Sequence, residues 1–131
     1  MRKPSRKTLI KNLDEVCREL ALERDGNRCV KCGVYSEGGY GLHASHIVPK
    51  QRGYHVRWVL DNIKILCAGC HLWWHKDPLA GIWLKDVLLK HDKVRYDRIK
   101  SINKDQRSSF KQNDLIELLE KLQAQRGKTL V

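Results

Sequence analysis

Two C-x-x-C pairs constrain the fold of this chain more than any other feature of its sequence. The first pair is Cys29 and Cys32, and the second is Cys67 and Cys70. The span between the pairs is long enough for a small hairpin, and this spacing brings four thiolates around one tetrahedral zinc ion. We therefore expect a structural zinc site formed by these four cysteines.

Side chains suited to a second kind of metal site lie between and just after the two cysteine pairs. They supply imidazole nitrogens, a candidate base and an amide: His43, His46, Asn62, His71 and His75. Such groups are typical of a hydrolytic metal site, which keeps an open position, rather than of a second structural site. Because His71 and His75 are four residues apart, both imidazoles can reach one ion from a helix. The alternative for His75 is a surface histidine that contacts a phosphate.

The charge of the chain indicates the class of its partner. The 131 residues include 26 Lys and Arg against 15 Asp and Glu, which gives a formal net charge of +11. The surplus is spread over the N-terminal, central and C-terminal parts of the sequence. This distribution favours contact with nucleic acid along an extended face, because Lys and Arg attract phosphates without regard to sequence.

Length, hydropathy and cysteine usage indicate where the protein works. The chain is long enough for one domain, and no apolar run approaches the length that crosses a membrane. Four of its five cysteines fall in the two pairs, which favours thiolate ligation in a reducing compartment over disulfides. We expect a cytoplasmic protein in which the fifth cysteine, Cys17, is a small buried hydrophobe.

Apolar periodicity predicts a helix before the cysteine-rich segment and a hairpin within it. Residues 1–7 are basic and resemble a mobile arm, and the helix covers 8–24 with Ser5 or Thr8 as its N-cap. The expected elements that follow are a strand over 42–48, a basic loop over 50–54, a loop or irregular strand over 55–60, and a strand over 63–66.

The C-terminal part is expected to be helical with a polar interruption. Asp77 ends a short helix over 68–76, and a second helix with proline at its first position covers 78–90. A last helix begins near Asp114, which together with Glu117 resembles a capping box. The stretch before it is expected to be polar and contains Ser101, Ser108 and Ser109. The expected organisation is one compact domain with three segments: 1–24, 25–77 and 78–131.

The central motifs resemble those of a known nuclease family. A His followed by Ile-Val-Pro, an Asn five residues before a Cys, and a C-x-x-C-H sequence are together similar to the HNH endonucleases in their zinc-containing, ββα-metal form. The likeness covers roughly residues 20–77. The run VRWVLDNIKILCAGC is also similar to the NinG/Rap-type recombination nucleases of lambdoid phages, in which a helical tail follows the core.

This resemblance implies an α+β fold in which a four-cysteine zinc site holds together a small ββα-metal core, flanked by N- and C-terminal helices. It implies a metal-dependent endonuclease that hydrolyses phosphodiester bonds in DNA, linked to recombination or DNA processing in a bacterial or phage-infected cell. The catalytic residues would be His46, Asn62 and His71, and the catalytic ion would be bound by His71 and His75. Imidazole ligands suit Zn²⁺, Mn²⁺, Ni²⁺ or Co²⁺, whereas Mg²⁺ prefers oxygen, so the sequence leaves the ion open.

In this scheme His46 is the general base, because an imidazole with a pKa near neutrality can take a proton from the attacking water. Asn62 would bond to the backbone of the hairpin loop and hold His46 in position. Ser45 departs from the family pattern, in which Asp, Glu or His commonly precedes the base and binds the metal. His43 lies on the same side of the strand as Ser45 and either substitutes for that ligand or is a plain strand residue.

The poor ligand at position 45 supports an alternative function, a zinc-ribbon nucleic-acid-binding module with weak or no catalysis. Four basic residues flank the site and could contact the nucleic-acid backbone, although a solvated charge is the favoured interpretation for any one of them: Lys50, Arg52, Arg57 and Lys64. Most of the four tryptophans are expected in the core rather than stacked on bases: Trp58, Trp73, Trp74 and Trp83. The sequence leaves open whether the DNA is duplex or branched and whether the protein acts as a homodimer.

Overall fold

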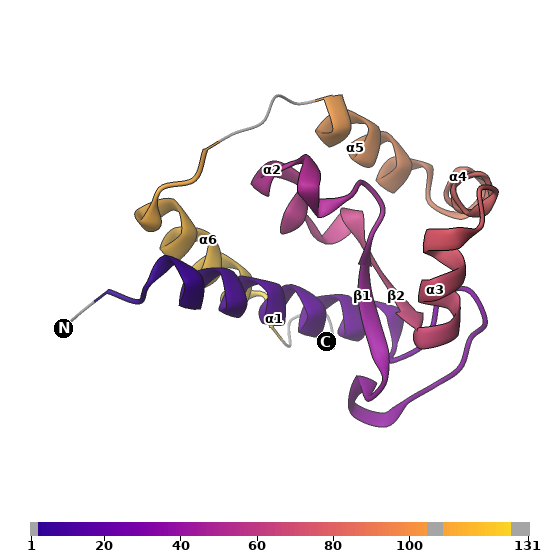
Figure 1. Cartoon of the computed structure of the whole chain (residues 1–131), viewed down its shortest axis with the longest axis horizontal. Helices are drawn as coiled ribbons and strands as arrows, with labels where there is room; N and C mark the ends of the chain where they lie inside the picture. The colour runs from indigo at the N-terminus through magenta and orange to yellow at the C-terminus, as the bar shows by residue number, and fades with distance from the viewer. Residues whose placement is uncertain (1–2, 105–108, 127–131) are drawn as a thin grey trace.

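The computed structural model describes residues 3–104 and 109–126. Over these residues the chain is a small α+β fold with six α-helices and one two-stranded antiparallel sheet (Figure 1). The elements are, in order, α1 (Arg6–Asp25), β1 (Leu42–His46), α2 (Tyr54–Arg57), β2 (Ile63–Cys67), α3 (Ala68–Lys76), α4 (Ala80–His91), α5 (Lys93–Lys104) and α6 (Gln112–Ala124). Three 3₁₀ turns lie between them: η1 (Glu37–Gly39), η2 (Lys50–Arg52) and η3 (Leu60–Asn62).

The sheet separates two layers of helices. Successive side chains of a strand point to opposite faces, so each face collects alternate residues. On one face, Leu42 and Ala44 of β1 pack with the buried side of α1. On the other face, Ser45 lies opposite Lys64 of β2, and the Lys64 side chain lies over Trp74 of α3. The expected ββ hairpin followed by a helix is therefore present, with α1 and α3 on opposite faces.

The larger hydrophobic core joins the two ends of the chain. α1 begins after Ser5, whose hydroxyl accepts a hydrogen bond from the Thr8 amide at 3.2 Å, and ends at Gly26 in the left-handed conformation. Its apolar residues recur at three and four positions and pack against α6, which lies alongside α1 in Figure 1. This core also contains Cys17, which is buried as expected.

A second apolar cluster lies on the far side of the sheet. Leu84 and Leu88 of α4 and Ile99 of α5 pack with Val48 and Val56 from the long connection between the strands. The cluster fixes α4 and α5 against this connection. The two clusters thus hold the hairpin between a layer from the chain ends and a layer from the middle helices.

The stretch expected to be a polar connection contains α5. Asp92 accepts a hydrogen bond from the Arg95 amide at 3.1 Å, which caps the helix, and Ile99 is buried with Tyr96 and Ile102 packed beside it. The expectation is wrong because the three apolar residues recur every three positions and so fall on one side of a helix. Packing of that side against α4 is enough to stabilise the helix although the rest of the stretch is polar. Ser108 lies outside the described residues, as do residues 1–2 of the expected arm.

Other expected boundaries also need correction. α1 starts two residues before Thr8, and α4 starts at Ala80 because Asp77 and Pro78 form a turn of their own. The connection expected to be loop or irregular strand contains the short helix α2. At the start of α6, the Asp114 carboxylate accepts from the amide of Lys111 at 2.8 Å, so Asp114 lies inside the first turn rather than before it.

Candidate functional site

Four cysteines converge at the junction of β2 and α3. Cys29 and Cys32 lie in the turn after α1, Cys67 ends β2, and Cys70 lies in the first turn of α3. Their sulfur atoms all lie within 4.8 Å of one another. The Sγ atoms of Cys32 and Cys67 are 3.8 Å apart, which is the edge of about 3.8 Å expected for a tetrahedron of Zn–S bonds of about 2.3 Å. The cluster therefore fits one tetrahedral metal ion.

Backbone hydrogen bonds shape the first cysteine pair into a tight turn. The Gly33 amide donates to the carbonyl of Cys29 at 2.9 Å, and the Cys29 amide donates to that of Val34 at 3.0 Å. Gly33 has a φ of 81°, a conformation that a residue with a side chain seldom adopts. The Val30 amide donates to Ile65 of β2 at 2.9 Å, so the turn is fixed to the strand that ends at the second pair.

The thiol groups differ in their readiness to ionise. Burial raises the pKa of Cys29, but amide donors from Cys32, Cys67 and Lys31 outweigh it and lower the pKa to about 6. Burial and hydrogen bonds among the neighbouring sulfurs raise the pKa of Cys70 to about 12. Since each thiolate opposes the next, full ionisation of the set requires a cation at its centre, as in a structural zinc site. Cys17 stands apart, with a pKa raised by burial to about 12.

Three histidines form a chain on the side of α3 that faces β1. Nδ1 of His43 lies 2.9 Å from Nδ1 of His71, and Nε2 of His71 lies 3.0 Å from Nε2 of His75. His71 therefore uses opposite ring nitrogens toward its two neighbours. Burial, followed by the neighbouring His75 and His43 and by Lys64, lowers the pKa of His71.

The distances favour His71 with His75, rather than His71 with His43, as the pair that could share one ion. Two imidazoles that share a tetrahedral ion at about 2.0–2.1 Å have nitrogens about 3.3 Å apart, so His71 and His75, at 3.0 Å, need only a small adjustment. His43 approaches the other nitrogen of His71 and does not point to the same position as His75. The structure thus brings the three histidines together without making them three ligands of one ion.

His46 is the last residue of β1 and is partly buried. Its Nε2 lies 2.8 Å from the carbonyl oxygen of Arg57, which can only accept, so Nε2 carries the hydrogen and Nδ1 is left with a free lone pair. Burial lowers the pKa of His46, the Arg57 carbonyl raises it, and the charge of Lys50 lowers it. With a pKa below its ordinary value, this imidazole is a free base at neutral pH.

Asn62 fixes the connection that carries the carbonyl partner of His46. It is 0% exposed. Its amide nitrogen donates to the carbonyls of Val48 and Val56, at 2.9 and 3.0 Å, and its oxygen accepts from the Val48 amide at 2.7 Å. These bonds are the loop contacts expected of Asn62, and they tie both ends of the segment between His46 and Arg57.

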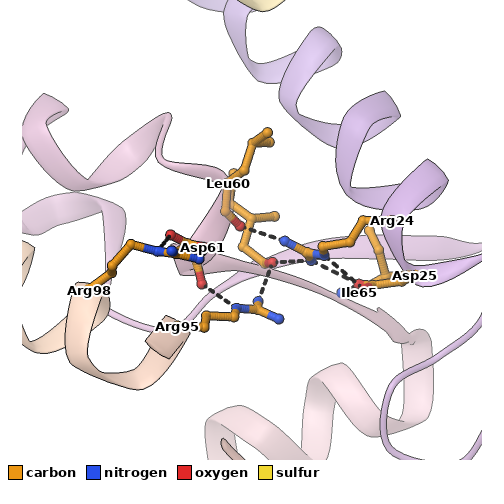
Figure 2. A network of polar contacts seen from close by, with 8 residues as sticks. Arg24, Asp25, Leu60, Asp61, Ile65, Arg95 and Arg98 are labelled. Atoms are coloured by element: carbon orange, nitrogen blue, oxygen red, sulfur yellow. Dashed lines mark hydrogen bonds and ion pairs between the residues drawn. The ribbon is translucent and has the colours of Figure 1, made fainter. Parts of the chain in front are cut away.

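Two arginines, Arg24 of α1 and Arg95 of α5, hold the segment around Asn62 (Figure 2). Both donate to the carbonyl of Ile63, at 2.5 and 3.0 Å. Arg24 also donates to the Leu60 carbonyl at 2.7 Å, and Arg95 to the Asp61 carbonyl at 2.8 Å, so both reach the carbonyls that precede Asn62. The rest of the Arg24 guanidinium pairs with the Asp25 carboxylate. Helices that lie far apart in the sequence therefore contribute to the rigidity of the connection.

An open hollow of about 510 Å³ brings these groups together. His46, His71 and His75 line it, together with Ser45 and Trp74. Lys50 lies at its border and also lines a second hollow of about 550 Å³, whose other basic residues are Arg6 and Arg57. The structure thus joins the candidate base and the candidate ligand pair in one place beside a basic surface.

The four basic residues expected to flank the site have different surroundings. Lys50 and Arg52 are exposed, and Arg52 donates to the carbonyl of Asn103 at 3.1 Å. Arg57 forms a two-point ion pair with Asp14, at 2.7 and 3.0 Å. Lys64 is only 1% exposed and so does not lie on the surface where a phosphate contact was expected.

The sequence analysis missed several residues around the site. Asp14 accepts from both Arg57 and the Trp58 indole, and a carboxylate on the polar face of an amphipathic helix gives no sign of this role. Arg6 and Phe110 meet at the second hollow from opposite ends of the chain, and only the packing of α1 on α6 brings them together. Most of the tryptophans pack in or against the apolar clusters, as expected: Trp58 is buried in the larger core, and Trp74 and Trp83 lie partly buried against the second cluster. Trp74 also lines the hollow.

No family model, curated protein or solved structure matches this chain. None of the described helices combines the length and apolar character needed to cross a bilayer. What the fold and site define directly is a small α+β protein with four cysteines positioned to hold a metal ion such as zinc.

Proposed function

We propose that this protein is a metal-dependent endonuclease of the HNH type that hydrolyses phosphodiester bonds in DNA. The observation that carries the proposal is that one open hollow is lined both by His46, whose Nε2 is held by the Arg57 carbonyl, and by His71 and His75, whose nitrogens face each other. A base and a ligand pair around one space are the parts that phosphodiester hydrolysis requires.

His46 would act on the attacking water. Its Nδ1 accepts a proton while Nε2 stays bonded to the Arg57 carbonyl, which also stabilises the imidazolium that forms. Asn62 keeps that carbonyl in place through its bonds to Val48 and Val56. The role of Asn62 is therefore to position the base rather than to contact the substrate.

His71 and His75 would hold a divalent ion in the same hollow. When bound, the ion supplies Lewis-acid stabilisation of the charge that builds on the phosphate and on the leaving oxygen. The two imidazoles leave further positions open, as a catalytic site requires. The four cysteines would hold a separate structural zinc ion.

The charge distribution favours DNA as the substrate. Lys50 lies at the border of the hollow, and the adjoining hollow adds Arg6 and Arg57, so that phosphates on one side of the cleaved bond have cationic partners. The resemblance to NinG/Rap-type nucleases favours duplex or branched DNA in recombination or DNA processing, in a bacterial or phage-infected cell. Action as a homodimer would allow both strands to be cut.

A second candidate is a nucleic-acid-binding module without catalysis. It is favoured by Ser45, which supplies no anionic ligand to an ion at His71 and His75 and instead bonds to Lys64. Such a module would use the same basic surface and the same structural zinc. It predicts DNA binding that does not depend on any ion other than that zinc.

Cleavage of supercoiled plasmid, with and without added Mn²⁺ or Mg²⁺, separates the two candidates. The nuclease should convert the plasmid to nicked or linear product only with added ion, and a mild chelator that leaves the four-thiolate zinc in place should stop it. Labelled duplex, branched and single-stranded DNA should then show which substrate is cut fastest. Tight binding to all of them without cleavage under any ion would favour the binding module.

A further inference from the structure

Ser45 and Lys64 form a buried polar pair under the hollow. They lie opposite each other in the sheet and are 2% and 1% exposed. The Lys64 ammonium lies 3.2 Å from the Ser45 hydroxyl oxygen and 3.3 Å from the centre of the Trp74 ring. A cation over an aromatic face gains electrostatic stabilisation, but a ring does not replace a counter-ion.

Lys64 has no anionic partner within the described parts of the chain. The ion pairs found there involve other residues, and the charge that lowers the pKa of Lys64, besides its burial, is that of Arg95, which is also a cation. A buried charge is costly unless it is paired. This cation is therefore disposed to attract an anion from outside the protein.

The hydrogen-bond chemistry of the pair gives it a direction. In its charged form, which predominates below a pH of about 7, the Lys64 ammonium can only donate, so the Ser45 oxygen is the acceptor. The hydroxyl hydrogen of Ser45 is then left to donate elsewhere. Ser45 and Trp74 both line the hollow that contains His46, His71 and His75, so an oxygen atom bound there can receive this hydrogen.

We propose that Ser45 and Lys64 form a binding site for a phosphate oxygen in the hollow, with the Ser45 hydroxyl as donor and the Lys64 ammonium as the charge behind it. The inference rests on the proposed function in one respect, namely that the phosphate is the scissile group of DNA. Position 45 would then serve the anionic substrate, and the serine would be a substitution with a role rather than a lost metal ligand.

The pKa of Lys64 sets the pH range in which this site carries a positive charge. Burial and the charge of Arg95 lower the pKa of Lys64 to about 7. The phosphate titration is therefore made below this pKa, where Lys64 is charged. The groups that face Lys64 are Arg95 from α5 and His71 from α3, and both are cationic or neutral.

Inorganic phosphate is the first probe. Zinc-loaded protein is titrated at pH 6.5 and followed by the amide NMR shifts of Ser45 and His46, which separate this site from the basic surface. We expect Ser45→Ala to weaken binding about tenfold or more, as for a lost hydrogen bond to a charged group, and Ser45→Thr to retain it. Lys64→Met should weaken it further. Ser101→Ala and Lys85→Met, on exposed faces of α5 and α4, are matched controls.

The result decides the inference separately from the proposed nuclease. Equal phosphate affinity of Ser45→Ala and the parent, or no shift in the parent, would overturn the phosphate site even if the protein cuts DNA. Loss of affinity in Ser45→Ala without any cleavage by the parent would support the site and overturn the nuclease. Because Ser45→Ala removes one oxygen atom, it decides the question even if Lys64→Met does not fold.

Ser45→Asp provides the sharpest contrast. A carboxylate at this position would pair with Lys64 and repel phosphate, so we expect phosphate binding to fall below that of Ser45→Ala. The affinity for Mn²⁺, measured by calorimetry on the zinc-loaded protein, should stay unchanged. Tighter Mn²⁺ binding by Ser45→Asp, with phosphate affinity retained, would show that position 45 faces the ion and would overturn the proposal.

Discussion

α3 carries two groups of side chains with different chemistry: the four-cysteine cluster at its start, and the imidazoles of His71 and His75 that we propose as ligands of a catalytic ion. At its start, Cys67 and Cys70 meet the first cysteine pair, and all four sulfurs face one centre. His71, the residue after Cys70, and His75, one turn further on, present imidazoles to an open hollow. The first group is closed by its own ligands, whereas the second leaves room for water and substrate. A metal site whose positions are all filled by protein ligands stabilises the fold, whereas a site with an open position can bind water and substrate.

The comparison also shows that the second site depends on the first. His71 follows Cys70 directly, so any ion that fixes the thiolates also fixes the helix from which the imidazoles project. The reverse dependence is weak, because no sulfur of the cluster is held by a histidine within the described residues. Loss of the cluster should therefore remove both sites, and loss of the histidines only one.

The largest expected effect is that of Cys67→Ser. We expect zinc content to fall from one ion per chain to near zero and most of the folded structure to be lost, because structural zinc contributes on the order of 10 kcal/mol to small zinc domains. Metal analysis and thermal unfolding followed by circular dichroism measure both effects.

Cys17→Ala is the matched control, since Cys17 is buried in the α1 core away from the cluster. It should cost about 1 kcal/mol and leave zinc content unchanged. A zinc-free parent, or full thermal stability in Cys67→Ser, would show that the cluster does not hold the fold together.

The next largest effect is expected for His46→Ala, which removes the proposed base from the open site. Removal of the base should slow cleavage about 10²–10⁴-fold while DNA affinity and zinc content stay close to those of the parent. Single-turnover cleavage and a gel-shift titration measure the two properties. His91→Ala, at the exposed end of α4, should behave as the parent. Unchanged cleavage by His46→Ala would assign the base to another residue.

The sequence predicts the four-cysteine site better than it predicts the open site, and the reason is physical. The four cysteines are recognisable because their spacing alone almost determines the geometry of a tetrahedral thiolate site. The facing nitrogens of His71 and His75 follow from helical spacing, but the hydrogen bond that orients His46 does not. That bond reaches the Arg57 carbonyl across a connection whose conformation is set by tertiary contacts.

The same limit applies to Lys64 and to α5. A lysine between apolar residues in a strand is expected at the surface, and only the position of Trp74 in α3 shows why it is buried. α5 has few apolar residues, and its stability comes from contacts that a local pattern does not contain, such as the bonds of Arg95 to the connection. Hydrophobic periodicity therefore predicts α1 well and α5 poorly.

Asn62→Ala tests whether the buried amide positions His46. The substitution leaves the buried amide of Val48 and the carbonyls of Val48 and Val56 without a partner, which should cost about 2–5 kcal/mol in urea unfolding. Cleavage should fall as well, because the carbonyl that orients His46 is released.

Asn62→Asp should be intermediate, since it keeps the acceptor for the Val48 amide but loses both donors. Asn103→Ala, on an exposed part of α5, is the control and should change stability by less than about 0.5 kcal/mol. If Asn62→Ala loses stability but keeps the full cleavage rate, the amide does not position the base.

The smallest expected effect is a shift in the pH dependence of cleavage caused by Lys50→Gln. The active form of His46 is unprotonated, and burial and the charge of Lys50 both lower its pKa, so the parent should stay active below the ordinary pKa of histidine of about 6.5. Loss of the lysine charge removes one of these effects. The pKa of His46 should then rise, and the acidic limb of the rate profile should move to higher pH.

Single-turnover rates at saturating DNA, measured across this limb, give its midpoint for each variant. The plateau is expected to fall too, since Lys50 borders the hollow, so the midpoint and not the rate is the test. Arg57 and Asp14 also face His46 and lower and raise its pKa respectively, and both are kept. Lys85→Gln, with its charge on the exposed face of α4, should leave the midpoint in place. A midpoint that Lys50→Gln does not move would mean that a group other than His46 sets the acidic limb.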